Sequence, residues 1–393
     1  MQITICGGGN AAHTATGIFS ANKNHHVNVY ISFPEEAKRW RDGISENGGI
    51  TVSGPSRSIT GRPQSISSTA SEVIPGSQLV LLALPAFAHE SVLREIGPWL
   101  EDGTLVGALA ARGCYDLSAR DCLGERANAI SLFGLQTLPW ACRIMEYGKE
   151  VQILGTKAQI DFATCPPQRT DEVCAFVAEQ LEIWLEPIGS FLSLTLAGTS
   201  QIIHPGVMYD LFRDWDGSPF NEAPLFYQGI DDGTAQVLQD LSDEIQSIKG
   251  ALLRQFPELD LQAVRPLDEW LCRSYAEHIE DTSSLRTYFV SNRSYAGLTV
   301  PMRETDAGLL PDFRARYLSE DIPYALLATR GIAELATVST PTMDRVIYWS
   351  QEKLGKEYLI QGELKGADMG RTRAPQRFGY QNLEVMIDAM FCP

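Results

Sequence analysis

The sequence of 393 residues predicts an α/β fold for its first half and an all-α-helical fold for its second half. Short apolar runs alternate with amphipathic stretches in the first half, a pattern typical of parallel strands joined by helices. Residues 79–84, for example, are all Leu, Val or Ala, as in a strand buried on both faces. From about residue 194 onward, apolar residues recur every three or four positions, which is typical of helices. We therefore expect two domains, at residues 1–195 and 196–393.

The elements of the first half can be placed individually. Strands are expected at residues 3–6, 27–31, 79–84, 105–109, 129–133 and 151–156. Helices are expected at residues 11–20 and 35–40, and a hairpin or loop in the polar stretch 51–63. In the second half we expect helices throughout, with no strand between them.

A glycine-rich turn follows the first strand. Residues 6–13 fit the pattern G-x-G-x-x-A, with Gly7, Gly9 and Ala12 at the signature positions. Gly7 permits the tight turn, Gly9 lets the backbone approach a pyrophosphate, and Ala12 lets the helix pack closely on the strand. The helix amino terminus then offers unpaired N–H groups to the phosphates. We predict a Rossmann-type dinucleotide site formed by Gly7, Gly8, Gly9, Asn10, Ala11 and Ala12.

The residues alone leave the choice between NAD and NADP open. The end of the second strand, where an acidic residue usually binds the adenosine ribose, carries Ser32 and no carboxylate. Ser32 could still bond a ribose hydroxyl. No arginine stands there to bind a 2′-phosphate, since the nearest are Arg39 and Arg41 on the next helix. This favours NAD.

Composition excludes several other classes of protein. The net charge of −17 argues against a nucleic-acid partner. The apolar run 79–88 is shorter than the roughly 20 residues of a membrane span, and the chain enters its first strand directly after Met1, so we expect a cytoplasmic protein. Eight cysteines are scattered without a CxxC pair, which favours reduced thiols over a disulfide framework or a metal site. No exposed apolar helix stripe calls for a partner, so we expect a monomer.

Several segments together resemble the opine dehydrogenases, the octopine/nopaline dehydrogenase family. The segments are residues 7–13, 84–90, 137–143, 203–205, 222–230, 316–323 and 351–358. The similarity is greatest to the invertebrate octopine, tauropine, alanopine and strombine dehydrogenases, which end anaerobic glycolysis. The resemblance implies that pyruvate, the amino group of an amino acid and NADH give an opine and NAD. It also implies NAD as the cofactor, with Pro85 and Ala86 beside it.

The resemblance implies a catalytic histidine. His204 precedes Pro205 just after the expected domain boundary, and an imidazole is suited to proton transfer at neutral pH. In isolation, His204 would more simply be a packed helix-end residue. Asp321 matches the acid that pairs with this histidine, although alone it would be interpreted as a helix N-cap. Arg316 matches an arginine that binds the cofactor pyrophosphate, with a surface salt bridge as the alternative.

The resemblance also implies the substrate residues. Thr137 could hold the keto-acid carboxylate, while Cys142 and Trp270 could contact the amino acid, with core packing as the rival for both. Arg112 stands where arginine-using members have a neutral amide, and Gly198 where they have a larger apolar residue. A second cation is unfavourable for a guanidinium substrate. We therefore expect taurine, alanine, glycine or β-alanine to be favoured over arginine.

Two other hypotheses of function also assume a nicotinamide cofactor. Ketopantoate reductases and glycerol-3-phosphate dehydrogenases have a similar architecture, but they use a lysine as proton donor, and no comparable lysine motif is found here. A non-enzymatic NAD-binding protein is the remaining alternative. Turnover that requires an amine as well as a keto acid separates these readings.

Overall fold

The computed structural model describes residues 1–54 and 58–391, which form two compact units. The first contains Met1–Leu194 and the segment that begins at Ile387, and the second contains Thr195–Met386. The α/β and helical fold classes predicted from the sequence are confirmed for the two halves of the chain. Within the described residues, no helix is long and apolar enough to cross a membrane.

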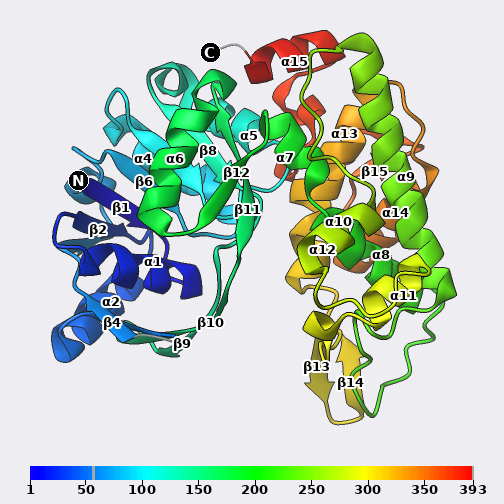
Figure 1. Cartoon of the computed structure of the whole chain (residues 1–393), viewed down its shortest axis with the longest axis horizontal. Helices are drawn as coiled ribbons and strands as arrows, with labels where there is room; N and C mark the ends of the chain where they lie inside the picture. Colours follow the sequence, from blue (N-terminus) through cyan, green and yellow to red (C-terminus); the bar gives the residue numbers. More distant parts are fainter. Residues whose placement is uncertain (55–57, 392–393) are drawn as a thin grey trace. The chain divides into compact units, whose positions relative to one another are not determined.

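The first unit is built on an eight-stranded sheet (Figure 1). Its strands, in spatial order, are β12 (Trp184–Pro187), β11 (Gln159–Cys165), β8 (Ser131–Leu135), β7 (Leu105–Ala108), β6 (Leu79–Leu82), β1 (Gln2–Cys6), β2 (His26–Tyr30) and β5 (Ser65–Ser67). The six strands from β8 to β5 are parallel, whereas β11 is antiparallel to β8. Every residue of β6 is buried, as expected for a central parallel strand.

Helices connect the parallel strands and cover the sheet. They are α1 (Asn10–Ala21), α2 (Pro34–Asn47), α3 (Ala70–Val73), α4 (Ala86–Ile96), α5 (Tyr115–Leu123) and α6 (Thr170–Leu181), with α7 (Phe191–Ala197) at the end of the unit. Helix α2 extends seven residues beyond the predicted end at Trp40, because Ile44 continues its buried face before Gly48 ends the helix in a left-handed conformation.

A second, four-stranded sheet corrects one expectation. It contains β4 (Ser58–Gly61), β3 (Ile50–Ser53), β10 (Glu150–Thr156) and β9 (Trp140–Glu146). The strand predicted at 151–156 therefore exists, but it pairs with β3 and β9 rather than extending the parallel sheet. The polar stretch 51–63 contains the antiparallel pair β3–β4, although its residues 55–57 lie outside the described residues.

The second unit is mainly helical. Its helices are α8 (Ser200–Phe212), α9 (Asp232–Gln255), α10 (Leu267–Tyr275), α11 (Leu285–Val290), α12 (Arg316–Ser319), the π-helix η5 (Ile322–Leu326), α13 (Leu327–Leu335), α14 (Pro341–Leu354) and the start of α15 (Leu383–Phe391). The expectation that no strand interrupts the helices is wrong, because two short hairpins occur: β13 (Met302–Thr305) with β14 (Gly308–Pro311), and β15 (Leu359–Ile360) with β16 (Glu363–Leu364). Figure 1 shows the β13–β14 hairpin projecting from the helices of its unit.

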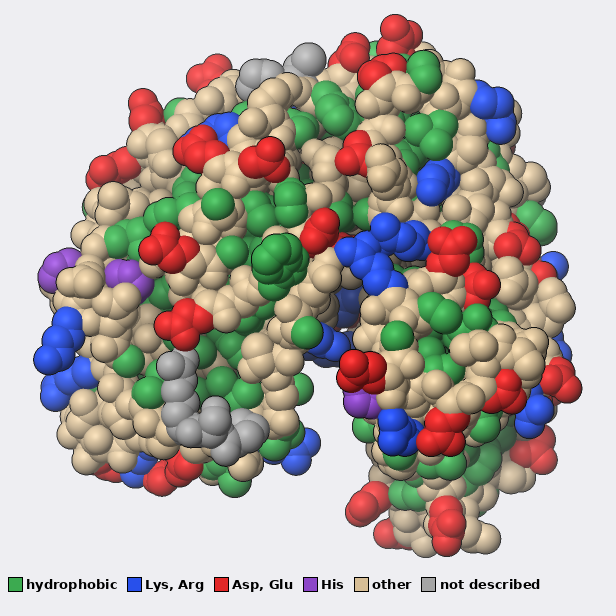
Figure 2. Space-filling model, viewed as in Figure 1, with side chains coloured by type: hydrophobic (Ala, Val, Ile, Leu, Met, Phe, Trp, Pro, Cys, Tyr) green, Lys and Arg blue, Asp and Glu red, His purple; other side chains and the backbone are tan. Residues whose placement is uncertain are grey.

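Acidic side chains are distributed over the face drawn in Figure 2, in keeping with the net charge of −17. Burial raises the pKa of the Cys6, Cys165 and Cys174 thiols, so these three are protonated and unreactive near neutral pH. Cys392 lies outside the described residues.

Candidate active site

The glycine-rich turn lies between the end of β1 and the start of α1. Gly7 has a φ of 134°, and a Cβ atom there would lie 2.6 Å from the carbonyl oxygen of Ala83, so only glycine fits. A Cβ atom at Gly9 would meet nothing within 4 Å. The turn is therefore closely packed at Gly7 and open at Gly9, the position at which a pyrophosphate is expected to approach the backbone.

The amino terminus of α1 suits a dinucleotide. Gly9 is the N-cap residue and provides no side-chain cap, so the first N–H groups of the helix remain for a ligand. The side chain of Asn10 accepts a hydrogen bond from the backbone N–H of Ile144 (2.9 Å). Asn10 would therefore contact a cofactor through its backbone, and the turn as a whole fits the diphosphate of NAD.

His13 holds this turn in place. Its Nε2 accepts a hydrogen bond from the N–H of Gly148 (2.9 Å), so the proton is on Nδ1, which donates to the carbonyl of Gly9 (2.9 Å). The ring packs on Trp40 with a centroid distance of 4.1 Å. Burial lowers the pKa of His13 to about 4, so the ring is neutral at physiological pH. His13 thus links the phosphate turn to the β9–β10 turn.

A carboxylate does lie at the end of β2, although the local sequence has none. The Oγ of Ser32 donates a hydrogen bond to Oε2 of Glu95 (3.0 Å), which is on α4. The hydroxyl of Tyr30 donates to the same oxygen. The sequence around positions 30–33 therefore did not reveal the carboxylate that lies beside this strand end.

Several predicted substrate residues lie where the parallel strands end. Arg112 follows β7 and Thr137 follows β8, and these two strands are neighbours. Arg112 has a φ of 61°, a costly conformation for a residue with a side chain and one that is frequent at functional sites. Pro85 and Ala86 start α4 after β6, at the same edge of the sheet. Ligands of open parallel sheets bind at this carboxyl edge.

Cys142 has a different environment. It lies in β9, and its partly buried thiol contacts Thr14 of α1. Burial raises the pKa of the thiol. This environment favours the packing role that was the rival of substrate contact.

The helical unit pairs His204 with Asp321. Nδ1 of His204 donates to Oδ2 of Asp321 over 2.7 Å. The Asp321 side chain is 1% exposed. Asp321 occupies the N-cap position of the next helical segment, but its side chain makes no cap hydrogen bond and is directed to His204 instead. A buried carboxylate requires a partner of this kind. Asp321 directly precedes the π-helix η5. Segments of this type are rare in proteins, and those that occur are often at functional sites.

Aromatic side chains enclose the His204 ring. Tyr317 stacks on it with a centroid distance of 4.0 Å and an interplanar angle of 13°. The hydroxyl of Tyr227 donates to Nε2 (3.3 Å), and burial raises the pKa of this tyrosine, which keeps it protonated. Both were missed as site residues, although they lie within the motifs at 222–230 and 316–323. The pair therefore presents Nε2 as the reactive nitrogen.

Trp270 belongs to the same aromatic cluster. Tyr227 stacks on Tyr295 (4.0 Å between centroids), Tyr295 contacts Tyr275 (5.0 Å), and Tyr275 contacts Trp270 (5.9 Å). Rings in this arrangement hold one another rigidly. A chain of ring contacts therefore joins Trp270, a predicted substrate residue, to Tyr227, whose hydroxyl bonds His204.

Arg316 forms an ion pair with Glu320 through Nε. The Glu320 side chain is 1% exposed, whereas that of Arg316 is 54% exposed. The buried Glu320 carboxylate thus holds the Nε end of the exposed Arg316 side chain and orients its guanidinium group. Whether this group binds a cofactor belongs to the proposed function.

Two other histidines differ in burial. His89 is fully buried, and its Nε2 bonds the carbonyl of Leu84 (3.0 Å). His278 is exposed in the turn after α10.

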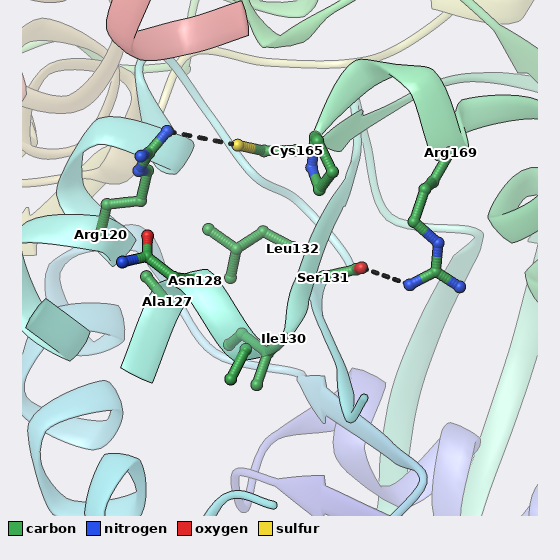
Figure 3. Close-up of a pocket in the computed structure, with 10 residues that line it drawn as sticks. Arg120, Ala127, Asn128, Ile130, Ser131, Leu132, Cys165 and Arg169 are labelled. Carbon is green, nitrogen blue, oxygen red and sulfur yellow. Dashed lines mark hydrogen bonds between the residues drawn. The ribbon is translucent and has the colours of Figure 1, made fainter. Parts of the chain in front are cut away.

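A cavity of about 210 Å³ lies elsewhere in the first unit (Figure 3). It is lined by the first residues of β8 and the end of the antiparallel strand β11, so it is at the amino edge of the sheet, opposite the phosphate turn. Its arginines have protein partners: Arg169 donates to Ser131 (2.6 Å), and Arg120 donates to the carbonyl of Ala389 (2.5 Å). This cavity is therefore not the candidate active site.

The phosphate turn and the His204–Asp321 pair define a nicotinamide-dependent dehydrogenase with a helical second domain. The family described as "NAD/NADP octopine/nopaline dehydrogenase, alpha-helical domain" matches residues 187–354. An opine dehydrogenase from Haliotis discus hannai is 38% identical, with 99% of each chain covered. A tauropine dehydrogenase from Arabella iricolor is 34% identical, with 98% of this chain and 99% of that protein covered.

Solved structures agree with the sequence relatives. An octopine dehydrogenase with NADH and L-arginine has a TM-score of 0.94 at 35% identity, covering 100% of this chain and 98% of that one. A ketopantoate reductase at 15% identity, with a TM-score of 0.57, shares the fold alone. The chain therefore belongs to the octopine/nopaline dehydrogenase family. It is an opine dehydrogenase, an NAD-dependent oxidoreductase that acts on CH–NH groups.

Proposed function

We propose that the chain condenses pyruvate with the amino group of a small or anionic amino acid, in preference to arginine, and reduces the product with NADH. The observation that carries this proposal is the buried His204–Asp321 pair in a chain related over its whole length to opine dehydrogenases. A related octopine dehydrogenase has been solved with NADH and pyruvate, which supports pyruvate as the keto acid.

The reaction requires a group that moves protons. The ammonium group of the amino acid, pyruvate, NADH and one proton give the opine, NAD and water. The amine nitrogen bonds to the keto carbon, the carbonyl oxygen leaves as water, and hydride is added to the same carbon. NADH supplies the hydride. Nε2 of His204 takes a proton from the ammonium group and returns one to the departing oxygen, while Asp321 stabilises the imidazolium through Nδ1.

Other residues bind the reactants. Gly7 to Ala12 hold the diphosphate of NAD against backbone N–H groups, and Arg316 adds its guanidinium to that diphosphate. Thr137 binds the carboxylate of pyruvate. Trp270 forms a wall for the amino acid.

Arg112 is the basis for the amino-acid preference. Arg112 lies at the carboxyl edge of the sheet, next to the strand that leads to Thr137. Such a cation attracts a sulfonate or carboxylate and repels a guanidinium. We therefore expect taurine, alanine, glycine or β-alanine to be used faster than arginine.

An amino-acid screen at fixed pyruvate and NADH tests this preference. The parent enzyme should turn over arginine slowest, and Arg112→Gln should raise the arginine rate relative to the taurine rate. Arginine as the best substrate of the parent would refute the preference. It would leave the opine dehydrogenase activity in place.

We further propose that the enzyme is a cytoplasmic monomer that regenerates NAD during anaerobic glycolysis. Light scattering of the purified protein should then give the mass of one chain, 43.3 kDa. A mass of two chains or more would contradict the monomer.

A further inference from the structure

The adenosine end of the cofactor site has an unusual source of negative charge. Dinucleotide sites generally place an acid from the second strand on the ribose hydroxyls, and an arginine nearby when the ligand is NADP. Here that strand end carries Ser32. Two carboxylates from different helices lie beside this strand end and the adjoining phosphate turn.

The first carboxylate is Glu95 of α4. Its Oε2 accepts hydrogen bonds from the hydroxyls of Ser32 (3.0 Å) and Tyr30. Burial and the bond to Glu95 raise the pKa of Tyr30 to about 12, so the phenol stays protonated and Glu95 stays the acceptor. Glu95 is thereby held beside the end of the second strand, next to Ser32.

The second carboxylate is Glu36, in the first turn of α2. A Cβ atom at Gly8 would collide with it, so Glu36 lies directly against the backbone of the phosphate turn. The hydroxyl of Tyr147 donates to Oε1 of Glu36 (2.6 Å) and fixes its orientation. A side chain at Gly8 would therefore require the Glu36 carboxylate to move.

The nearest arginines of α2 are directed elsewhere. The guanidinium of Arg39 lies over the Tyr147 ring, 4.2 Å from its centroid. Nη1 of Arg41 donates to the carbonyl of Ile66 (3.0 Å). Both guanidinium groups are therefore engaged with protein groups rather than directed at the end of the second strand, where a 2′-phosphate would need one.

We propose that Glu36 and Glu95 together bind the adenosine ribose hydroxyls of NAD and exclude the 2′-phosphate of NADP. This inference rests on the NAD-dependent activity and names the residues that select the cofactor. Carboxylate oxygens accept hydrogen bonds from the 2′- and 3′-hydroxyls. The same oxygens repel the two negative charges of a 2′-phosphate.

Equilibrium binding of NADH and NADPH, without substrates, tests the proposal. Removing one like charge a few ångströms from a phosphate in a partly solvated site is worth about tenfold. Glu36→Gln and Glu95→Gln should each tighten NADPH binding by about this factor, and the double variant should tighten it further. NADH binding should weaken by a few-fold in each.

Glu46→Gln on α2 and Glu90→Gln on α4 are the controls, because each removes a carboxylate from one of the same helices. Glu46 forms an ion pair with Lys149 (2.8 Å), and Glu90 accepts from Ser118 (3.0 Å). Equal NADPH gains in the controls, a gain in only one of the two test variants, or no gain in the double variant would overturn the proposal. Failure of the parent to bind NADH at all would instead refute the function itself.

Discussion

His204 donates a hydrogen bond from Nδ1 to Asp321 over 2.7 Å, joining residues that are 117 positions apart in the chain. The carboxylate is almost completely buried, and the imidazole is held between it, the Tyr317 ring and the Tyr227 hydroxyl. Nδ1 is bonded to the buried carboxylate, so Nε2, which accepts only the long bond from the Tyr227 hydroxyl (3.3 Å), is the nitrogen that can exchange a proton with a substrate. The pair is therefore arranged for acid–base catalysis, and its consequences can be measured.

Replacing His204 should abolish turnover and spare cofactor binding. A positioned general acid–base group contributes about 10²- to 10⁴-fold to rate, so His204→Ala should lower kcat/KM by about a thousandfold. NADH affinity should remain within about twofold, because the phosphate turn belongs to the other unit. Steady-state kinetics and NADH fluorescence titration measure the two quantities. Unchanged turnover would show that another group moves the protons.

Asp321→Asn should lower kcat by about 10²- to 10⁴-fold, because an amide can donate to Nδ1 and thereby stabilise the wrong tautomer. Ser200→Ala is a matched control, since its hydroxyl contacts the other carboxylate oxygen at 3.4 Å. A bond of that length is weak, so the control should retain activity within about threefold. Equal losses in both variants would indicate disruption of the fold rather than of the tautomer.

Gly9→Val should separate NADH binding from folding. The position is open, and valine is a poor N-cap, so the fold should lose only about 1 kcal/mol. The valine side chain would occupy the space of the pyrophosphate, and NADH affinity should fall at least about a hundredfold. Gly7→Ala, in contrast, should also destabilise the fold, by about 1–3 kcal/mol, because of its positive φ. Calorimetry of each variant distinguishes them, and tight NADH binding by Gly9→Val would contradict the site.

His13 should make the fold sensitive to acid. Its pKa is lowered to about 4 in the folded protein, from an ordinary value of 6.5. The unfolded chain therefore takes up the proton first as the pH falls, and stability is lost between pH 6.5 and 4, by about 3 kcal/mol in total. Above pH 6.5 both states are neutral and no such loss occurs.

The matching variant is His13→Gln. It should be about 1 kcal/mol less stable than the parent at pH 7, because the bonds to Gly9 and Gly148 are lost or weakened. Its further loss between pH 7 and pH 5 should be smaller than that of the parent by about 2 kcal/mol. Denaturant unfolding at both pH values measures this, and parallel pH profiles would rule out His13 as the cause.

Local patterns predicted most of the fold and the phosphate turn. Strands β6 and β7 are short apolar runs, β1 and β2 have apolar residues at alternate positions, and the turn is a continuous motif, so neighbouring residues contain the information. Strand β9 alternates buried or half-buried residues with exposed ones, but it was missed because the exposed positions include the apolar Ala141 and Met145, so its sequence shows no apolar–polar alternation. The hairpin strands β15 and β16 have two residues each, too few for any pattern.

Contacts between distant segments could not be predicted in this way. The Glu95–Ser32 bond spans 63 positions and connects a helix to a strand end, so the local sequence around Ser32 contains no sign of it. His204 and Asp321 could be paired in advance only through the family resemblance. Tyr227 and Tyr317 stand in the motifs that carry the resemblance, and recognising them required the ring contacts themselves.

The dependence of NADH oxidation on both substrates tests the central claim most directly. With pyruvate alone or the amine alone, NADH should remain unoxidised. With both present, one NADH should be consumed for each opine formed, as measured by absorbance at the nicotinamide band and by mass spectrometry of the product. Oxidation of NADH by pyruvate without an amine, giving lactate, would contradict the assignment of this chain as an opine dehydrogenase.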